Sequence, residues 1–268
     1  MNRNKRSMKP EEYLEEFKLT LSELYKDHKA EFLFKEWPID VKYFRDKKNK
    51  PIYTLEAEYF LNNYSITPKQ YFDIIKPLNR TLCYRQENHS GKQTSNGDNA
   101  YTTEKVEAKA LFNSIKDTKY PFVIIDYEVP LREHSSNKGI GEIDLIGKKG
   151  DTVFLLELKK FKDPNGALFH MILQSYTYMK LLNMDNFKKE YECKKVIPAI
   201  LFFEGSENCK QFNDPRNVVF KELLKHLDMK AFVVKRKANS VFKDDKDIYT
   251  DEKDKPILRY PVEIVELN

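Results

Sequence analysis

Three charged residues sit on two short apolar runs of the chain. Asp144 lies within the run 140–146, and Glu157 and Lys159 close the run 152–159. Side chains alternate along a strand, so Glu157 and Lys159 point the same way, and pairing of the two runs brings Asp144 alongside them. Buried charges on apolar strands need a partner or a metal ion. The pattern therefore indicates either a metal site or a salt-bridged sheet edge.

A hard divalent cation such as Mg²⁺ suits the first alternative. Mg²⁺ takes oxygen ligands, keeps several waters, and is commonly held by one or two carboxylates together with substrate phosphate. Lys159 would then lie near the metal-bound water and the phosphate. In the second alternative, Lys159 forms a structural ion pair with Glu157 or Asp144.

The segments around these residues predict an α-β-β-β-α-β order. The turn GKKGD, rich in glycine and charge, favours a hairpin between the two runs. A helix opening at Thr103 and a β-branched strand at 120–131 are expected before the hairpin. A helix at 167–182 and a strand at 195–204 are expected after it.

These residues resemble a known family. Asp144 followed by Glu157-Leu158-Lys159 resembles the D…(D/E)xK signature of the PD-(D/E)xK nuclease superfamily. The phrase GEIDLIGKKGDTVFLLELK is similar to endonucleases related to archaeal Holliday-junction resolvases. Ile143 stands where that family usually has proline. The resemblance covers about the middle third of the chain, on the scale of an ordinary domain.

The resemblance implies both a fold and an activity. It implies an α/β (α+β) restriction-endonuclease-like core, in which helices flank a central mixed sheet. It also implies Mg²⁺-dependent hydrolysis of phosphodiester bonds in nucleic acid, with Mn²⁺ able to substitute and DNA favoured over RNA. Asp144, Glu157 and the carbonyl of Leu158 would be metal ligands. Lys159 would orient the attacking water or stabilise the transition state.

A helix glutamate completes the implied metal shell. Glu104, Ala108, Leu111 and Ile115 fall on one face of the predicted helix, so Glu104 prolongs its core-facing stripe. By the resemblance Glu104 becomes a catalytic residue and metal ligand, with Glu107 as the competitor. Without it, Glu104 is a favourable charge at a helix N-terminus.

The helix after the hairpin carries a second motif. His170, Gln174 and Tyr178 are each four residues apart and therefore share a face. Gln174 and Tyr178 resemble the QxxxY motif of RecB-like members of the superfamily, which implies substrate binding beside the active site. His170 is expected to be a packing residue. The basic residues Lys160 and Lys162 are expected to contact the substrate backbone.

Composition permits these interpretations. The 268 residues carry a net charge of +5, a mild excess that allows nucleic-acid binding without demanding it. The three cysteines lack zinc-type spacing, and we expect them to be reduced. No apolar run is long enough to cross a membrane, so the expected location is cytoplasmic, with no membrane partner. The oligomeric state stays open, a homodimer included.

The chain is expected to divide into three parts. Residues 1–85 are expected to be a mainly helical accessory region with a hairpin near 39–56, residues 86–101 a polar linker or loop, and residues 102–268 the nuclease-like domain. His89 is expected to be solvated in the linker. Asp126 and Glu128 are expected at the solvent-facing or edge side of their strand, with Glu128 able to approach the site. A charged loop at 239–255 and a last strand at 256–265 would end the chain.

Two other classes of function remain open from the sequence. One is a catalytically inactive nuclease-fold module that binds nucleic acid or protein, although the intact Asp144, Glu157 and Lys159 argue against it. The other is an unrelated α/β interaction protein in which the hairpin charges are salt bridges. In that case metal would neither bind nor stabilise the fold.

Overall fold

A computed structural model describes residues 9–33, 52–62, 67–80, 82–85, 89–92, 104–117, 119–131, 141–161, 168–237 and 247–267. The first half of the chain contains these elements: α1 Pro10–Lys26, η2 Ala30–Phe32, α2 Ile52–Asn62, α3 Pro68–Phe72, α4 Glu104–Ser114, β1 Val123–Pro130, β2 Glu142–Lys149 and β3 Thr152–Leu158. The second half contains these: α5 Leu168–Leu181, α6 Met184–Glu190, β4 Lys195–Phe203, α7 Glu207–Asn213, η4 Pro215–Asn217, α8 Val218–His226, β5 Lys230–Arg236, β6 Ile248–Thr250, β7 Pro256–Leu258 and β8 Val262–Leu267.

The fold is α+β, and a mixed six-stranded sheet forms its centre. The strand order is β1-β2-β3-β4-β5-β8. The β1–β2, β2–β3 and β5–β8 pairs are antiparallel, whereas β3–β4 and β4–β5 are parallel. From α4 to β4 the elements follow the predicted α-β-β-β-α-β order, with the short helix α6 inserted before β4. The predicted hairpin at Asp144 is the β2–β3 pair.

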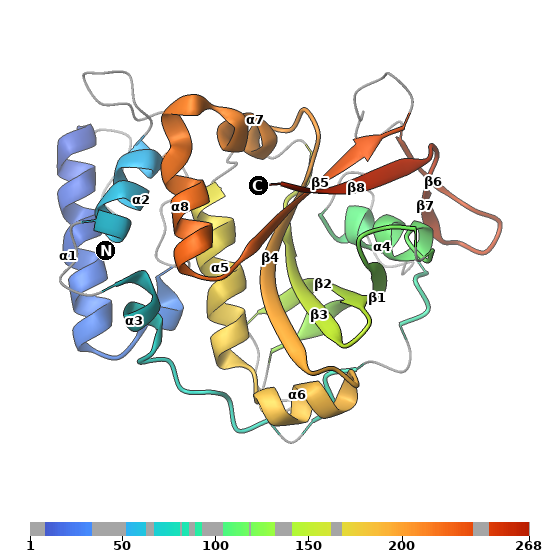
Figure 1. Ribbon diagram of the computed structural model, residues 1–268, viewed down its shortest axis with the longest axis horizontal. Helices are drawn as coiled ribbons and strands as arrows, with labels where there is room; N and C mark the ends of the chain where they lie inside the picture. The colour runs from blue at the N-terminus through green and yellow to red at the C-terminus, as the bar shows by residue number, and fades with distance from the viewer. Residues whose placement is uncertain are drawn as a thin grey trace.

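Helices cover both faces of this sheet (Figure 1). Helix α4 packs on one face, where Ala108, Leu111 and Ile115 join a hydrophobic cluster with strand residues such as Leu145 and Leu156. Helix α5 packs on the other face through a larger cluster that includes α8. Among the described residues, no helix is long and apolar enough to cross a membrane. The molecule is therefore layered, with the β2–β3 hairpin between α4 and α5.

The N-terminal helices form an outer layer against α5, to the left in Figure 1. Phe17 of α1 and Phe60 of α2 both pack on Phe169, with ring centroids 6.2 and 5.8 Å away. Phe72 of α3 packs on Tyr176 at 4.9 Å. Helix α5 is thus apolar nearly all round because it is covered on two sides. The predicted mainly helical N-terminal region is confirmed.

The expected hairpin at 39–56 is wrong in its second strand. Residues 52–62 form helix α2, because Tyr53, Ala57 and Phe60 recur at helical spacing and are buried. Thr54 adds a hydrogen bond from its hydroxyl to Asn217 Oδ1 at 2.9 Å. Tertiary packing outweighs the β-type composition of PIYTLE. The first expected strand lies outside the described residues.

The C-terminal expectations also need correction. The expected single strand at 256–265 is two strands, β7 and β8, separated by a segment that contains Pro261. Proline cannot donate a ladder hydrogen bond, which favours a break. Within the expected charged loop, Ile248–Thr250 forms strand β6 and pairs with β7.

Part of the expected linker is fixed to the sheet. His89 Nδ1 lies 2.6 Å from Asp126 Oδ1, and the His89 ring stacks on Tyr127. Asp126 is buried and also accepts a hydrogen bond from the Tyr191 hydroxyl at 2.7 Å. The expectations of a solvated His89 and an exposed Asp126 are therefore wrong. The register shift between Ile124 and Asp126 explains this, because a bulge re-aims the side chains that follow it.

Candidate metal centre

Asp144 and Glu157 face each other across the β2–β3 hairpin. The register pairs Leu145 with Leu156, so the next positions outward are Asp144 and Glu157. The backbone N–H of Leu158 donates to Asp144 Oδ2 at 2.7 Å, and the Glu157 side chain is only 1% exposed. The hairpin therefore brings two carboxyl groups to one place at the end of the sheet.

The Lys159 side chain lies among these carboxylates. Its Nζ is 2.6 Å from Glu157 Oε1 and 3.3 Å from Glu104 Oε1, and it donates to the Leu158 carbonyl at 3.2 Å. The side chain is 13% exposed. The Lys159 ammonium therefore partly neutralises the negative charge of the carboxylates around it. The Leu158 carbonyl oxygen lies beside the same ammonium.

The first residue of α4 supplies the third carboxylate. One oxygen each from Glu104, Asp144 and Glu157 lies within 4.8 Å of the others, and we call these three residues the carboxylate cluster. Glu107, the competitor for this place, instead accepts hydrogen bonds from the Phe161 N–H at 3.2 Å. Of these two glutamates, Glu104 therefore belongs to the carboxylate cluster. Glu107 binds the backbone of the segment that follows β3.

Burial and like charge perturb the acids. Burial, reinforced by the charge of Glu157, raises the pKa of Asp144 well above its ordinary value. Burial raises the pKa of Glu157 to about 7, and Lys159 opposes this rise. For Lys159, burial lowers the pKa, but the carboxylates of Glu157, Glu104 and Asp144 together hold it above its usual range. The cluster therefore carries more negative charge than one ammonium can stabilise.

The carboxylate cluster fits a hard divalent cation. The buried Glu157 Oε2 has no hydrogen-bond partner within the described part of the chain. An orphaned buried carboxylate oxygen calls for a proton or a cation. Oxygen donors from three carboxylates, with a backbone carbonyl beside them, are the ligand type that Mg²⁺ and Mn²⁺ prefer. Asp144, Glu157, Glu104 and the Leu158 carbonyl would hold it.

Helix α5 forms the adjoining wall. Gln174 Nε2 donates to the Tyr178 hydroxyl at 3.1 Å. The Tyr178 hydroxyl lies against Gly141, three residues before Asp144. Burial raises the pKa of Tyr178, and the negative charges of Glu157 and Asp144 raise it further. Gln174 and Tyr178 therefore share one face of α5, as the helix spacing predicts.

His170, expected to be a packing residue, belongs to the same wall. It lies one turn before Gln174 and is partly buried. Burial and the nearby Lys159 charge lower the pKa of His170 to about 3. The imidazole is therefore neutral near pH 7 and lies within electrostatic reach of Lys159. Its four-residue spacing from Gln174 is the sequence signal for this position.

The other predicted residues lie differently. Glu128 stays outside the carboxylate cluster, and its Oε2 lies 3.8 Å from Lys105 Nζ. Lys105 also pairs with Glu142 at 3.1 Å. Lys160 is half-buried, and across the described ranges it has no hydrogen bond or ion pair through its side chain. Lys162 lies outside the described residues.

The missing side chain of Gly141 leaves room for the Tyr178 hydroxyl. The φ of Gly141 is +138°, and a Cβ at this position would overlap the Tyr178 hydroxyl. We expect Gly141→Ala to displace the tyrosine and to lower the free energy of unfolding by about 1–3 kcal/mol, measured by denaturant melts. Close packing against Tyr178 therefore explains why residue 141, the first residue of the GEIDLI sequence, is glycine.

A matched control is Gly150→Ala. Gly150 also has a positive φ, +55°, but a Cβ added to it would meet no atom within 4 Å. Gly150→Ala should therefore lower the free energy of unfolding by less, because only the backbone cost of a positive φ applies to it. Adding Tyr178→Phe to Gly141→Ala should recover only part of the stability, because the ring carbon Cζ remains, 2.6 Å from the added Cβ. Equal losses for the two alanine variants would show that the Tyr178 contact is not the cause.

Comparison with protein-family models, with curated proteins and with solved structures finds no match for this chain. Any function therefore has to be argued from the carboxylate cluster and its surroundings.

Proposed function

We propose that this protein is a metal-dependent nuclease that hydrolyses phosphodiester bonds of nucleic acid, with DNA as the favoured substrate. The observation that carries the proposal is the carboxylate cluster of Glu104, Asp144 and Glu157 around the Lys159 ammonium. The resemblance of GEIDLI…ExK to the PD-(D/E)xK superfamily supports the same chemistry. The α+β core with a hairpin between two helices is compatible with it.

Asp144, Glu157, Glu104 and the Leu158 carbonyl would hold Mg²⁺, or Mn²⁺ in its place. The metal supplies Lewis acidity and offsets the negative charge of the phosphate. Hydrolysis adds a water oxygen to phosphorus, breaks one P–O ester bond and leaves a proton on the released alcohol. Negative charge grows on the phosphoryl oxygens as this happens.

The chain's own residues have distinct parts in this proposal. The Lys159 ammonium pairs with Glu157 and Glu104, and with a divalent cation bound it would be available to hydrogen-bond the water or the phosphate. Gln174 and Tyr178 position the substrate from helix α5. The exposed part of Lys160 faces the charged phosphate backbone of the substrate. Lys162 follows in the same basic stretch.

The first test of the proposal is the response of the fold to metal. Mg²⁺ or Mn²⁺ should raise the Tm, because the folded state alone assembles the carboxylate cluster. At a hundredfold excess over Kd the gain is about 2.7 kcal/mol, or several degrees for a chain of this size. Asp144→Asn should lose most of this shift in thermal melts, while Ca²⁺ should act as a weaker substitute.

Glu142→Gln is the matched control, because Glu142 is a carboxylate two residues away that pairs with Lys105 instead. It should keep the full shift. If Asp144→Asn responds to metal as the parent does, Asp144 is not a ligand. If the parent shows no shift with either metal, the cluster is a structural ion-pair network and the interaction-protein alternative is favoured.

A further inference from the structure

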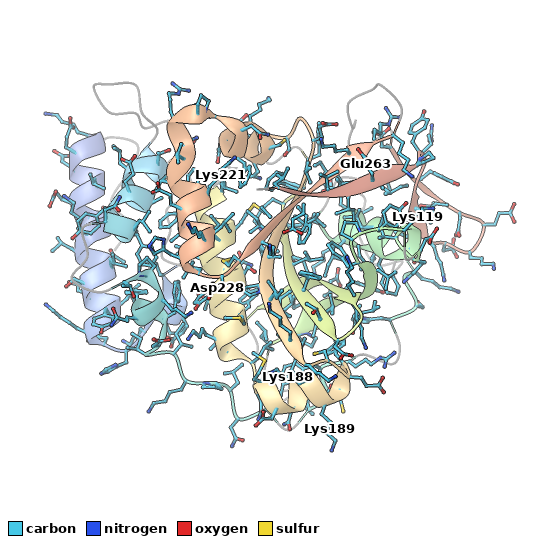
Figure 2. All side chains as sticks on the ribbon, in the orientation of Figure 1. Lys119, Lys188, Lys189, Lys221, Asp228 and Glu263 are labelled. Carbon is cyan, nitrogen blue, oxygen red and sulfur yellow. The ribbon has the colours of Figure 1, made fainter. Side chains whose placement is uncertain are left out.

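Glu107 is a buried carboxylate that the chemistry described so far does not use. It lies one turn after Glu104 on α4, so the two side chains share a face of the helix. Charged side chains such as Lys189 and Glu263 lie at the surface (Figure 2), whereas Glu107 is 0% exposed. A buried carboxylate is costly unless hydrogen-bond donors satisfy it. The groups that donate to Glu107 therefore indicate what this carboxylate does.

A backbone N–H in the segment that carries Lys159 donates to Glu107. The Phe161 N–H lies 3.2 Å from both Oε1 and Oε2 of the carboxylate. Phe161 follows Lys159 by two residues, and strand β3 has already ended at Leu158. The Lys159 N–H donates to the Leu201 carbonyl at 3.4 Å, which is long for a bond of the sheet. Glu107 therefore anchors the chain where the sheet holds it weakly.

The Phe161 ring gives this anchor a second support. It packs edge-on against the Phe203 ring, with the ring centroids 6.5 Å apart. Phe203 belongs to the hydrophobic cluster between α4 and the sheet. The backbone and the side chain of Phe161 are thus both held. Lys159 is one of only two residues between this fixed point and Leu158 in β3, so its backbone has little freedom to move.

The first turn of α4 contacts the hairpin at two further points. Glu104 Oε1 lies 3.3 Å from Lys159 Nζ. Lys105 Nζ lies 3.1 Å from Glu142 Oε2, at the start of β2. This turn is therefore tied both to the beginning of β2 and to the segment after β3. Loss of the Glu107 bond would loosen the second connection, on which the distance between Glu104 and Lys159 depends.

We propose that Glu107 is a positioning residue of the carboxylate cluster, which holds the backbone after β3 so that the Lys159 ammonium keeps its place among the carboxylates. This inference rests on the proposed nuclease function. Glu107 is outside the group of described acids whose oxygens lie within 4.8 Å of one another, so it acts without binding the metal. A reacting group displaced by about 1 Å can lose on the order of a hundredfold in rate. An anchor two residues from Lys159 therefore affects the reaction without touching the substrate.

The test compares Glu107→Leu with Glu107→Gln in the cleavage of labelled DNA with Mg²⁺, beside thermal melts of the same samples. Leucine leaves the Phe161 N–H without this acceptor, so kcat should fall on the order of ten- to a hundredfold while KM changes little. Glutamine keeps one acceptor oxygen, so Glu107→Gln should recover most of kcat. Both variants should keep most of the Mg²⁺-induced rise in Tm, because the three carboxylates of the cluster remain.

Gln211→Leu is the matched control. Gln211 is also buried, and its Oε1 accepts the Leu168 N–H at 3.3 Å. The substitution removes the same kind of bond outside the carboxylate cluster, so it should lower the Tm and leave kcat of the folded protein unchanged. Should Glu107→Leu not fold, Glu107→Asp takes its place, because the shorter side chain keeps the charge and withdraws the acceptor from Phe161.

Three results would overturn the inference. Loss of the metal response in Glu107→Gln, as expected for Asp144→Asn, would make Glu107 a metal ligand. Parent kcat in folded Glu107→Leu, or in Glu107→Asp where that replaces it, would make the anchor a structural contact only, and the nuclease proposal would stand. A parent that cleaves no nucleic acid would remove the nuclease proposal and this inference with it.

Discussion

Lys159→Ala is expected to lose cleavage while it keeps, and even enlarges, the response to divalent metal. The substitution removes an ammonium that stabilises charge at the phosphate but removes no ligand oxygen. A well-placed electrostatic group of this kind is worth roughly a hundredfold or more in rate. The enlarged metal response follows because Lys159 Nζ now shares Glu157 and Glu104 with any metal ion. Without the ammonium, the three carboxylates repel one another until a cation binds.

The measurement is cleavage of a labelled DNA panel (linear, nicked, branched and single-stranded) with Mg²⁺ and with Mn²⁺, beside thermal melts of the same samples. Lys149→Ala is the matched control, because Lys149 is an exposed lysine at the turn end of β2 in the same hairpin, outside the carboxylate cluster. It should cleave nearly as the parent does. If Lys159→Ala cleaves as fast as the parent, the reactive centre lies elsewhere. If the parent cleaves no DNA, RNA substrates and the binding-module alternative are favoured.

Glu157 is expected to make the metal-free protein less stable as pH rises from about 4.5 to about 7. In the folded state burial raises its pKa to about 7, while the unfolded chain has the ordinary value of 4.5. Between these values the folded protein binds more protons, so stability is full below the lower pKa and is lost as pH rises through the upper one. A shift of this size corresponds to about 3 kcal/mol.

Glu157→Gln isolates this contribution, because glutamine has the same shape and does not titrate. Melts of both proteins across this pH range in EDTA should diverge, with the parent becoming the less stable toward neutral pH. Saturating Mg²⁺ should restore the parent and leave the variant unchanged, since the cation stabilises the ionised carboxylate. Parallel curves for the two proteins would show that Glu157 is not buried as described.

The sequence anticipates the carboxylate cluster because its positions depend on short-range rules. The GKKGD turn sets the hairpin register, and the register sets Asp144 opposite Glu157. Helical spacing from Ala108 to Ile115 turns Glu104 toward the core. Only the choice between Glu104 and Glu107 needs the structure, because both lie in the first turn of α4.

Other features depend on contacts that no local pattern encodes. The bulge after Ile124 turns Asp126 inward, and its partners His89 and Tyr191 come from 37 and 65 residues away. Helix α2 exists because α5 and α8 cover its apolar face, against the β-type composition of its first turn. Strands β6 and β7 are three residues long, which is too short for alternation to show.

The ammonium inside the carboxylate cluster also bears on ion selectivity. With all three carboxyls ionised, Lys159 leaves two negative charges uncompensated. A divalent cation would neutralise these two negative charges. Sodium or potassium would leave one of them unneutralised. A monovalent ion would also have to compete with the Lys159 ammonium, which loses no translational entropy because it is covalently attached to the protein. The Lys159 ammonium therefore occupies the carboxylate cluster as a covalently attached monovalent cation. We expect potassium at cellular concentrations to compete poorly with magnesium for this position.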